Sequence, residues 1–235
     1  MTQMSITHLK PSYFTFIFIG IVLLDLVAGT MDSITFRHFT KPLILLSLFI
    51  YFAINGKNLG KTIYVTMLFA LFFSWLGDVM LMYDYISGTY FILGLASFLI
   101  AHVLYTIIFI AKWKKKNDVT FLMVLFALTS YGILLFWQLK DNLGEMRIPV
   151  IVYVFAIMTM AIAAFKRKNN INQKSFILVF LGALFFIASD SLLAINKFLI
   201  SIPYPHIMVM ATYATAQYLI TRGVLFQNAE NKLTP

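Results

Sequence analysis

The feature that most restricts the fold of this chain is a series of long apolar stretches separated by short polar segments. A helix needs about 20 predominantly apolar residues to cross the hydrocarbon core of a bilayer. Eight stretches approach or reach that length: residues 13–29, 38–55, 62–83, 89–111, 119–139, 148–165, 174–195 and 207–226. We therefore expect an all-α, polytopic membrane protein in which residues 1–235 form one domain of eight transmembrane helices.

The composition of the chain is that of a membrane protein rather than a soluble one. Hydrophobic residues make up 61% of the chain and charged residues only 11%, whereas about a quarter of a soluble domain is charged. The net charge of +9 would suggest a nucleic-acid partner in a soluble protein, but here the basic residues lie between the apolar stretches. We read them as topology signals that face anionic lipid, and expect membrane lipids rather than nucleic acid as partners. Because cysteine is absent, disulfides, zinc–thiolate sites and a catalytic thiol are excluded.

The distribution of basic residues between successive loops predicts the orientation of the chain. Thirteen Lys and Arg residues fall on the side that both termini share in an eight-span topology, and five fall on the other side. Since loops rich in Lys and Arg stay in the cytoplasm, both termini are expected there. No cleavable signal peptide or eukaryotic trafficking motif is recognisable, so we expect a multi-pass protein of a bacterial inner membrane.

Three of the nine acidic residues, Asp25, Asp78 and Asp190, fall inside apolar stretches. An ionised carboxylate is costly in hydrocarbon, so such a residue is a functional candidate by default. Asp78 follows Thr62, and Asp190 follows Lys174, by sixteen residues, which places both carboxyl groups ~24 Å from the cytoplasmic boundary, in the outer half of the bilayer. Asp25 lies near the outer end of its span, where pairing with a loop cation is the alternative explanation.

The surroundings of the two deep aspartates resemble each other. "ALFFSWLGD" (70–78) and "ALFFIASD" (183–190) share an ALFF run, a serine and a terminal aspartate, and Pro42 and Pro149 lie near the starts of the second and sixth spans. One interpretation is a 4+4 tandem repeat whose equivalent helices face each other across a shared cavity. The other is chance similarity between apolar segments.

Other polar residues lie at helical spacing within the spans. His102 and Tyr105 are at positions i and i+3, and Tyr213 and Gln217 are at i and i+4, so each pair lies on one face of its helix. A polar contact between neighbouring helices is the structural explanation for His102 and Gln217. Lys197 is explained equally well as an end residue that reaches for the membrane surface.

Catalytic motifs of other enzyme classes are missing from the sequence. We find no serine-nucleophile elbow, no zinc-protease motif, no phosphate-binding loop and no dinucleotide-binding fingerprint. The four histidines are scattered without metal-ligand spacing. The paired aspartates are thus the main catalytic candidates.

Five segments resemble the signature segments of the lysoplasmalogenase (YhhN-like) family. They are TKPL (40–43), FSWLGDVMLM (73–82), AHVLY (101–105), ASDSLLAINKF (188–198) and YATAQYLI (213–220). They occur in the family's order in a chain of similar length and span number, and the paired GD and SD segments are the most specific.

This resemblance implies an integral-membrane hydrolase that cleaves the vinyl ether bond of lysoplasmalogens, lysophospholipids with an alkenyl chain. The products are a fatty aldehyde and glycerophosphocholine or glycerophosphoethanolamine, and no metal or organic cofactor is implied. The implied catalytic pair is Asp78 and Asp190. Supporting substrate-binding candidates, in or beside the matching segments, are Lys41, Ser74, Trp75, His102, Tyr105, Ser189, Asn196, Tyr213 and Gln217.

The chemistry of the paired aspartates agrees with that implication. Vinyl ether hydrolysis begins with proton delivery to the β-carbon and passes through an oxocarbenium ion, so one carboxyl must be protonated and the other ionised, as in glycosidases. The sequence leaves open which aspartate is the acid. For the headgroup, Lys41 or Lys197 could meet the phosphate, and Trp75, Tyr83 or Tyr85 the choline or ethanolamine cation.

Two other functions remain possible on the sequence alone. A proton-coupled transporter of a small molecule or lipid would share the intramembrane acids and the repeat. Against it, the prolines fall in loops, at first turns or at the terminus, so we expect continuous helices. The other possibility is a lipid-binding or scaffolding membrane protein whose acids are structural.

Overall fold

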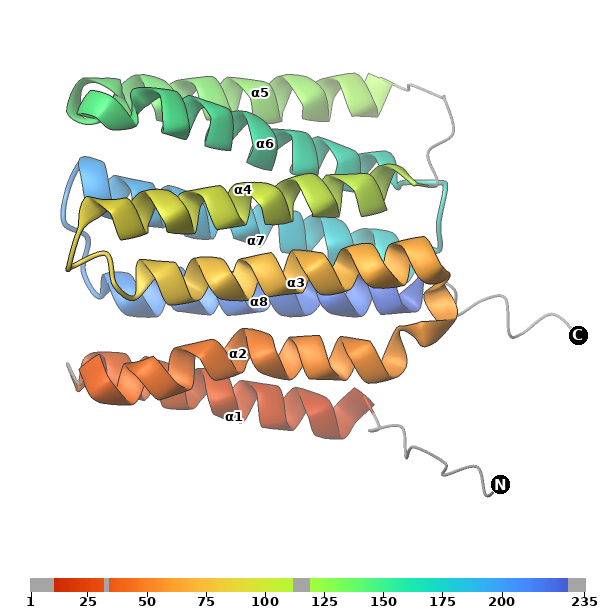
Figure 1. The fold of residues 1–235 in the computed structure, drawn as a ribbon. Helices are drawn as coiled ribbons and strands as arrows, with labels where there is room; N and C mark the ends of the chain where they lie inside the picture. The colour runs from red at the N-terminus through yellow and green to blue at the C-terminus, as the bar shows by residue number, and fades with distance from the viewer. Residues whose placement is uncertain (1–10, 32–33, 112–118, 228–235) are drawn as a thin grey trace, which may run out of the picture.

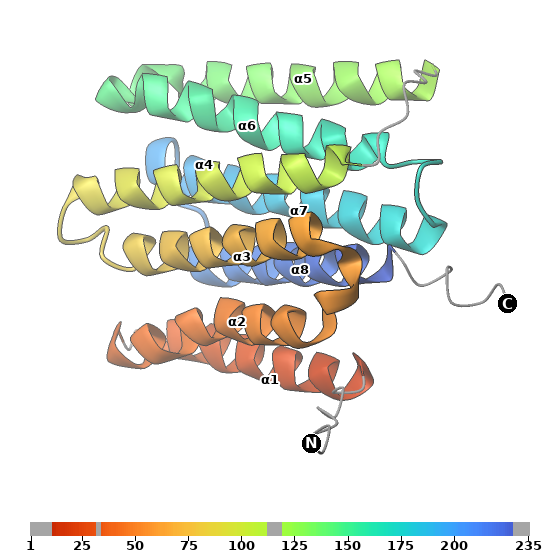
Figure 2. The same ribbon diagram turned by 45° about the vertical axis from the view of Figure 1, so that its right-hand side comes forward.

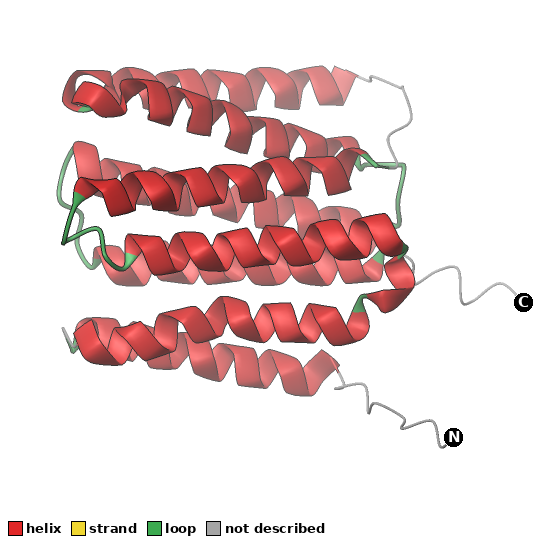
Figure 3. Ribbon diagram, in the orientation of Figure 1, coloured by secondary structure: helices red, strands yellow, loops and turns green. Residues whose placement is uncertain are grey.

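The structure is a computed structural model that describes residues 11–31, 34–111 and 119–227. Within these ranges the chain forms eight long α-helices and three short 3₁₀-helices, and no strand (Figure 3). The long helices are α1 (Pro11–Thr30), α2 (Ile34–Asn55), α3 (Lys61–Leu81), α4 (Gly88–Ile110), α5 (Val119–Leu139), α6 (Arg147–Lys166), α7 (Gln173–Phe198) and α8 (Pro205–Phe226). The short ones are η1 (Lys57–Leu59), η2 (Lys140–Asn142) and η3 (Gly144–Met146). The predicted all-α fold with eight long helices is confirmed.

Seven of these helices, α1 to α7, are long and apolar enough to cross a membrane. The last helix, α8, has 22 residues but carries more polar side chains. Tyr213, Gln217 and Thr221 are among them, and all three are buried inside the bundle. These inward-facing polar groups lower the hydropathy of α8, so its crossing of the membrane stays a prediction.

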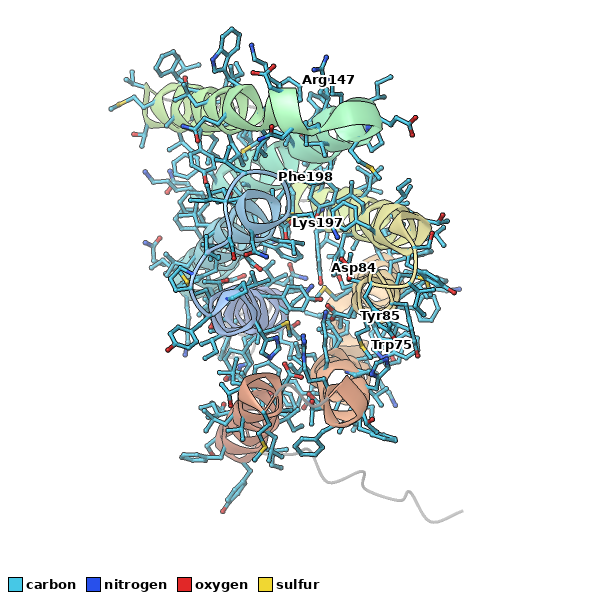
Figure 4. The ribbon with its side chains drawn as sticks, turned by 90° about the vertical axis from the view of Figure 1, so that its left-hand side faces the viewer. Trp75, Asp84, Tyr85, Arg147, Lys197 and Phe198 are labelled. Carbon is cyan, nitrogen blue, oxygen red and sulfur yellow. The ribbon has the colours of Figure 1, made fainter. Side chains whose placement is uncertain are left out.

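The helices lie side by side in a broad bundle (Figures 1 and 2). α1 and α2 form one edge, α5 and α6 form the opposite edge, and α3, α4, α7 and α8 lie between them. The α3–α4, α5–α6 and α7–α8 connections share one end of the bundle, and the view from that end places α3 and α4 opposite α7 and α8 (Figure 4). One cluster of buried apolar side chains includes residues from all eight helices.

The central helices form two closely packed pairs, α3 with α4 and α7 with α8. Gly77, next to Asp78, explains the close approach in the first pair. A Cβ atom at this position would lie 2.7 Å from the ring of Phe98 on α4. A small residue at a membrane helix interface lets the neighbouring helix approach closely, and here it places the Phe98 ring close to the backbone beside Asp78.

Pro42 corrects one prediction from the sequence. It lies inside α2, which begins at Ile34, and not in a loop or first turn. Its nitrogen cannot donate the helical hydrogen bond to the carbonyl of His38, yet the helix continues through it to Asn55. Arg37, His38 and Lys41 therefore belong to the first two turns of α2.

The predicted orientation and tandem repeat stay predictions. Six of the basic residues counted for the orientation lie outside the described residues: Lys10, Lys112, Lys114, Lys115, Lys116 and Lys232. The helices that carry Asp78 and Asp190, α3 and α7, each belong to one of the closely packed pairs, an arrangement that a repeat would produce.

Candidate active site

A cavity of about 400 Å³ lies between the central helices and the start of α2. It reaches the end of the bundle where the α3–α4 and α7–α8 connections lie, which is the end that faces the viewer in Figure 4. Asp78 from α3 and Asp190 from α7 both line it. The two carboxyl groups that the sequence places at one depth thus share one cavity. Charged and polar residues that also line it are Arg37, His38, Lys41, Asp84, Tyr85, Ser189, Asn196, His206 and Tyr213.

Asp78 is held by a tyrosine and faces a lysine. The hydroxyl of Tyr213 donates a hydrogen bond of 2.8 Å to Oδ2 of Asp78, and Nζ of Lys41 lies 3.9 Å from Oδ1. Asp78 and Lys41 are both buried, at 2% and 8% exposure. Asp78 is therefore a buried carboxyl group with an ammonium group beside it.

A chain of hydrogen bonds behind Asp78 fixes the direction of the Tyr213 hydroxyl. Tyr105 donates to Oε1 of Gln217 at 2.6 Å, so the amide group of Gln217 faces Tyr213 and donates to its hydroxyl oxygen at 3.4 Å. With its oxygen accepting from Gln217, Tyr213 directs its own proton to Asp78. The structure therefore joins three of the supporting candidates, Tyr105, Tyr213 and Gln217, to one catalytic candidate.

Asp190 has a different environment. The hydroxyl of Tyr153 on α6 donates a hydrogen bond of 2.6 Å to Oδ2 of Asp190. Among the described residues, no Lys, Arg or His nitrogen lies within 4.0 Å of this carboxyl group. Tyr153 is not among the residues predicted from the sequence. Its depth could have indicated it, because Tyr153 and Asp190 each lie five residues from the predicted outer boundary of their spans, or ~7.5 Å in a helix.

Asp190 also lines a second, smaller cavity of about 50 Å³ that we call the apolar slot. Its other walls are almost entirely hydrophobic and come from α3, α4, α5, α6 and α7. Leu81, Phe98 and Leu193 line both the apolar slot and the large cavity. Asp190 therefore lies where a polar compartment adjoins an apolar one.

Two further candidates on α7, Ser189 and Asn196, line the large cavity and also form hydrogen bonds to the backbone of other segments. Ser189 donates to the carbonyl of Val209 on α8 at 3.1 Å, and the side-chain oxygen of Asn196 accepts from the backbone N–H of Ile202 at 3.2 Å. Lys197, one residue further on, does not line the cavity but pairs with Asp84 of its lining at 2.8 Å, and Figure 4 labels both residues.

Five supporting candidates lie outside both cavities. Tyr105 and Gln217 contact the site through Tyr213, and the other three are His102, Ser74 and Trp75. His102 is fully buried, with its ring 5.2 Å from that of Tyr153 and 4.7 Å from that of Phe186, and within the described chain neither ring nitrogen has a hydrogen-bond partner. Ser74 is fully buried one turn before Asp78. Trp75 packs near Phe72 and lies toward the edge of the bundle in Figure 4. None of the three is placed to touch a molecule in either cavity.

In the described ranges, no group of three or more His, Asp or Glu side chains is placed to hold a metal ion. The polar groups of the site are hydroxyl, amide, carboxyl and basic side chains. This set suits proton transfer and the binding of an anion.

Comparison with known proteins identifies relatives of this chain. It is 34% identical to lysoplasmalogenase TMEM86B of Sus scrofa over 134 residues, which are 57% of this chain and 54% of that protein. It is 31% identical to a lysoplasmalogenase of Mycobacterium bovis over 142 residues, 58% of this chain and 51% of that protein. Lysoplasmalogenase TMEM86A of Bos taurus is 32% identical over 154 residues, 64% of this chain and 61% of that protein.

These matches span between about half and three fifths of the length of the relatives. No solved structure matches the chain. The sequence profile of the YhhN family matches residues 36–224, a range that contains the cavity and both aspartates. This chain therefore belongs to the YhhN family.

Proposed function

We propose that this protein is a lysoplasmalogenase that hydrolyses the vinyl ether bond of a membrane lysophospholipid. The observation that carries the proposal is the pair of aspartates in one cavity, of which Asp78 is buried and faces a cation, and Asp190 is partly buried and adjoins an apolar slot. The names of the relatives in the YhhN family support the same reaction. The individual catalytic roles come from the environment of each carboxyl group.

Asp190 is the proton donor in this proposal, and Asp78 is the ionised partner. Asp78 lies near the Lys41 ammonium group, which stabilises a negative charge. Asp190 has only a neutral hydroxyl as its hydrogen-bond partner within the described structure. An ionised carboxylate without a cation is costly even in a partly buried site among apolar helices, so Asp190 is the carboxyl that holds the proton.

The reaction then proceeds in balanced steps. Asp190 gives its proton to the β-carbon of the vinyl ether, which leaves an oxocarbenium ion and an Asp190 carboxylate. The negative charge of Asp78 stabilises this cation, and Asp78 accepts a proton as water adds to the α-carbon. The resulting hemiacetal collapses to aldehyde and glycerol hydroxyl, and the proton held by Asp78 returns to Asp190 through solvent in the cavity.

The two cavities divide the substrate between them. The polar headgroup and glycerol occupy the large cavity, and the double bond lies beside Asp190 at its junction with the apolar slot. The apolar slot is too small for a whole fatty chain, so it holds the first methylene groups. Leu135 and Leu139 of α5 form part of its wall, and most of α5 faces outward. The rest of the chain passes beside α5 into the bilayer.

The test of this function is aldehyde release by the protein purified in detergent. We expect lysoplasmenylethanolamine to yield fatty aldehyde and glycerophosphoethanolamine in equal amounts, and the saturated alkyl ether analogue to yield neither. In D₂O the aldehyde is expected to carry one deuterium on the carbon next to the carbonyl, because that carbon receives the catalytic proton. Folded protein that releases no aldehyde from any lysoplasmalogen would refute the proposal. Aspartate-dependent lipid flux across vesicles would then favour the transporter.

Filling the apolar slot with a larger side chain tests whether the alkenyl chain of the substrate lies in it. Ala194 lines the slot, so Ala194→Phe is expected to raise KM for a long-chain lysoplasmalogen by about tenfold, the effect of losing burial for two or so methylene groups. A vinyl ether with a two-carbon chain is expected to react as it does with the native protein. The matched control is Ala96→Phe, at an exposed position of α4 outside the slot. Equal KM changes for the long-chain and the two-carbon substrates would show that the alkenyl chain does not lie in the slot.

A further inference from the structure

The large cavity contains a cation, Arg37, that no carboxylate of the described residues neutralises directly. Arg37, His38 and Lys41 of α2 all line it. Lys41 faces Asp78 at 3.9 Å, and Asp84 of the lining is paired with Lys197 at 2.8 Å. Arg37 has no carboxylate oxygen within 4.0 Å in the described part of the chain, and its Nε is buried without a hydrogen-bond partner.

Arg37 is held in place by a histidine from the other side of the bundle. Its Nη2 lies 2.9 Å from Nδ1 of His206 on α8. Because a guanidinium group can only donate hydrogen bonds, Nδ1 is the acceptor and the ring proton is on Nε2. The Nε2–H group in turn donates to the backbone carbonyl of Asp25 at 3.0 Å. His206 is thus a neutral ring in a fixed tautomer, and the lone pair of its Nδ1 points toward Arg37.

Asp25 completes this arrangement from α1. Its Oδ2 lies 3.4 Å from Nε2 of His206, its Oδ1 accepts from the Thr40 hydroxyl at 2.8 Å, and its side chain is fully buried. Gly29, one turn later, leaves room for the histidine, since a Cβ atom there would overlap with Cδ2 of the ring. Asp25 therefore pairs with a hydroxyl and a histidine, not with a loop cation among the described residues.

We propose that Arg37 and Lys41 form the subsite for the phosphate of the lysophospholipid, and that His206 is the positioning residue that fixes Arg37. This inference rests on the function proposed above. Arg37 and Lys41 are four residues apart on one face of α2, so their side chains extend from successive turns. A phosphodiester between them receives the paired donors of the guanidinium group and the point charge of the ammonium group.

The subsite lies in the same cavity as the proposed catalytic pair. Lys41 contributes to the phosphate subsite and also faces Asp78, so the phosphate would bind on the Asp78 side of the cavity. Arg37 lies a further turn toward the N-terminal end of α2, where the cavity reaches the end of the bundle. The bound phosphate would supply the negative charge that Arg37 lacks in the described protein.

The decisive experiment compares a substrate that has a phosphate with one that lacks it. We expect Arg37→Gln to raise KM for alkenylglycerophosphoethanolamine by about 10- to 100-fold, the effect of losing a charge-assisted hydrogen bond, with kcat changed little. For alkenylglycerol of the same chain length, KM should not change. The control is Arg147→Gln, an arginine at the same end of the bundle but outside the cavity (Figure 4), for which both KM values should stay at the native level.

Two variants of His206 test whether this residue positions Arg37 for phosphate binding or only stabilises the fold. His206→Phe is expected to raise KM for the phosphate substrate alone, and His206→Gln is expected to restore part of the loss because its amide oxygen can still accept from Arg37. Equal KM changes for both substrates in Arg37→Gln, or no change for either, would overturn the subsite.

Binding of the unreactive alkyl ether analogue provides a readout that needs no catalysis. We expect Arg37→Gln to weaken binding of the alkyl glycerophosphoethanolamine by about 10- to 100-fold and to leave binding of the alkylglycerol unchanged. If native protein binds the phosphate analogue through Arg37 but hydrolyses no vinyl ether, the proposed reaction is wrong and the phosphate subsite stands. If it hydrolyses the vinyl ether and Arg37→Gln binds both analogues normally, the reaction stands and the subsite is wrong.

Discussion

Replacing Asp190 by asparagine is expected to reduce kcat for aldehyde release by about 1,000-fold, within the range measured for the loss of a general acid. The amide of asparagine has nearly the shape of the carboxyl group but cannot deliver a proton to carbon. Its oxygen can still accept the hydrogen bond that Tyr153 donates to Asp190, so the variant should fold. The measurement is single-turnover aldehyde release from lysoplasmenylethanolamine, beside the melting temperature of each protein in detergent.

The matched control for this variant is Asp141→Asn. Asp141 is an exposed carboxylate in η2 and lines neither cavity, so its substitution should leave both kcat and KM unchanged. Retention of a tenth or more of the native kcat in Asp190→Asn would exclude Asp190 as the acid. Alkenyl substrate that still exchanges deuterium into its β-carbon in Asp190→Asn would point to a different proton donor.

The common level of the two aspartates could be predicted from sequence because helix rise is fixed. Counting residues from the predicted ends of their spans places Asp78 and Asp190 at the same level, and the structure shows both in one cavity. Helical spacing likewise placed Tyr213 and Gln217 on one face, and the structure links them by a hydrogen bond. Level along a helix and position on its face both follow from regular helix geometry, so neither prediction required knowledge of the tertiary structure.

The rotation of each helix could not be predicted in the same way. In a membrane both the lipid and the protein core are apolar, so hydrophobic residues do not mark the inward face of a span as they do in a soluble helix. The sequence therefore did not show that Tyr153 faces Asp190, or that His206 reaches Arg37 and Asp25 from α8. The same uncertainty explains why Trp75 and His102, both close to site residues in sequence, lie outside the cavities.

The contacts that define the site join helices far apart in the sequence. Tyr213 meets Asp78 across 135 residues, and His206 meets Asp25 across 181. Such pairs depend on which helices become neighbours, and short-range patterns carry no information about that choice. The start of α2 shows the same limit. Its charged first turns look like a boundary segment in sequence, but they are helical and line the cavity.

Removing the cation beside Asp78 is expected to affect stability and catalysis together. Lys41→Met leaves the buried Asp78 carboxylate without its ammonium partner, which should lower the free energy of unfolding by about 2–3 kcal/mol. That is at or below the usual 3–5 kcal/mol for breaking a buried pair, because the pair is long, at 3.9 Å, and lies in a cavity. The same variant should lose about 100-fold in kcat, since an Asp78 carboxyl that takes up a proton can no longer stabilise the oxocarbenium ion.

A double-mutant cycle distinguishes the effect of the Lys41–Asp78 pair from a general loss of structure. Asp78→Asn alone should reduce kcat by about 100- to 1,000-fold. Adding Lys41→Met should reduce it little further, because Lys41→Met acts by favouring the neutral form of Asp78, and Asp78→Asn has already removed that negative charge. The double variant should also recover most of the stability lost in Lys41→Met, since no unpaired charge remains in it. Lys197→Met is the control, because its pair with Asp84 is exposed and should contribute only about 0–1 kcal/mol. Additive losses in the double variant would show that Lys41 and Asp78 act independently, and the ionised role would then have to be assigned on other grounds.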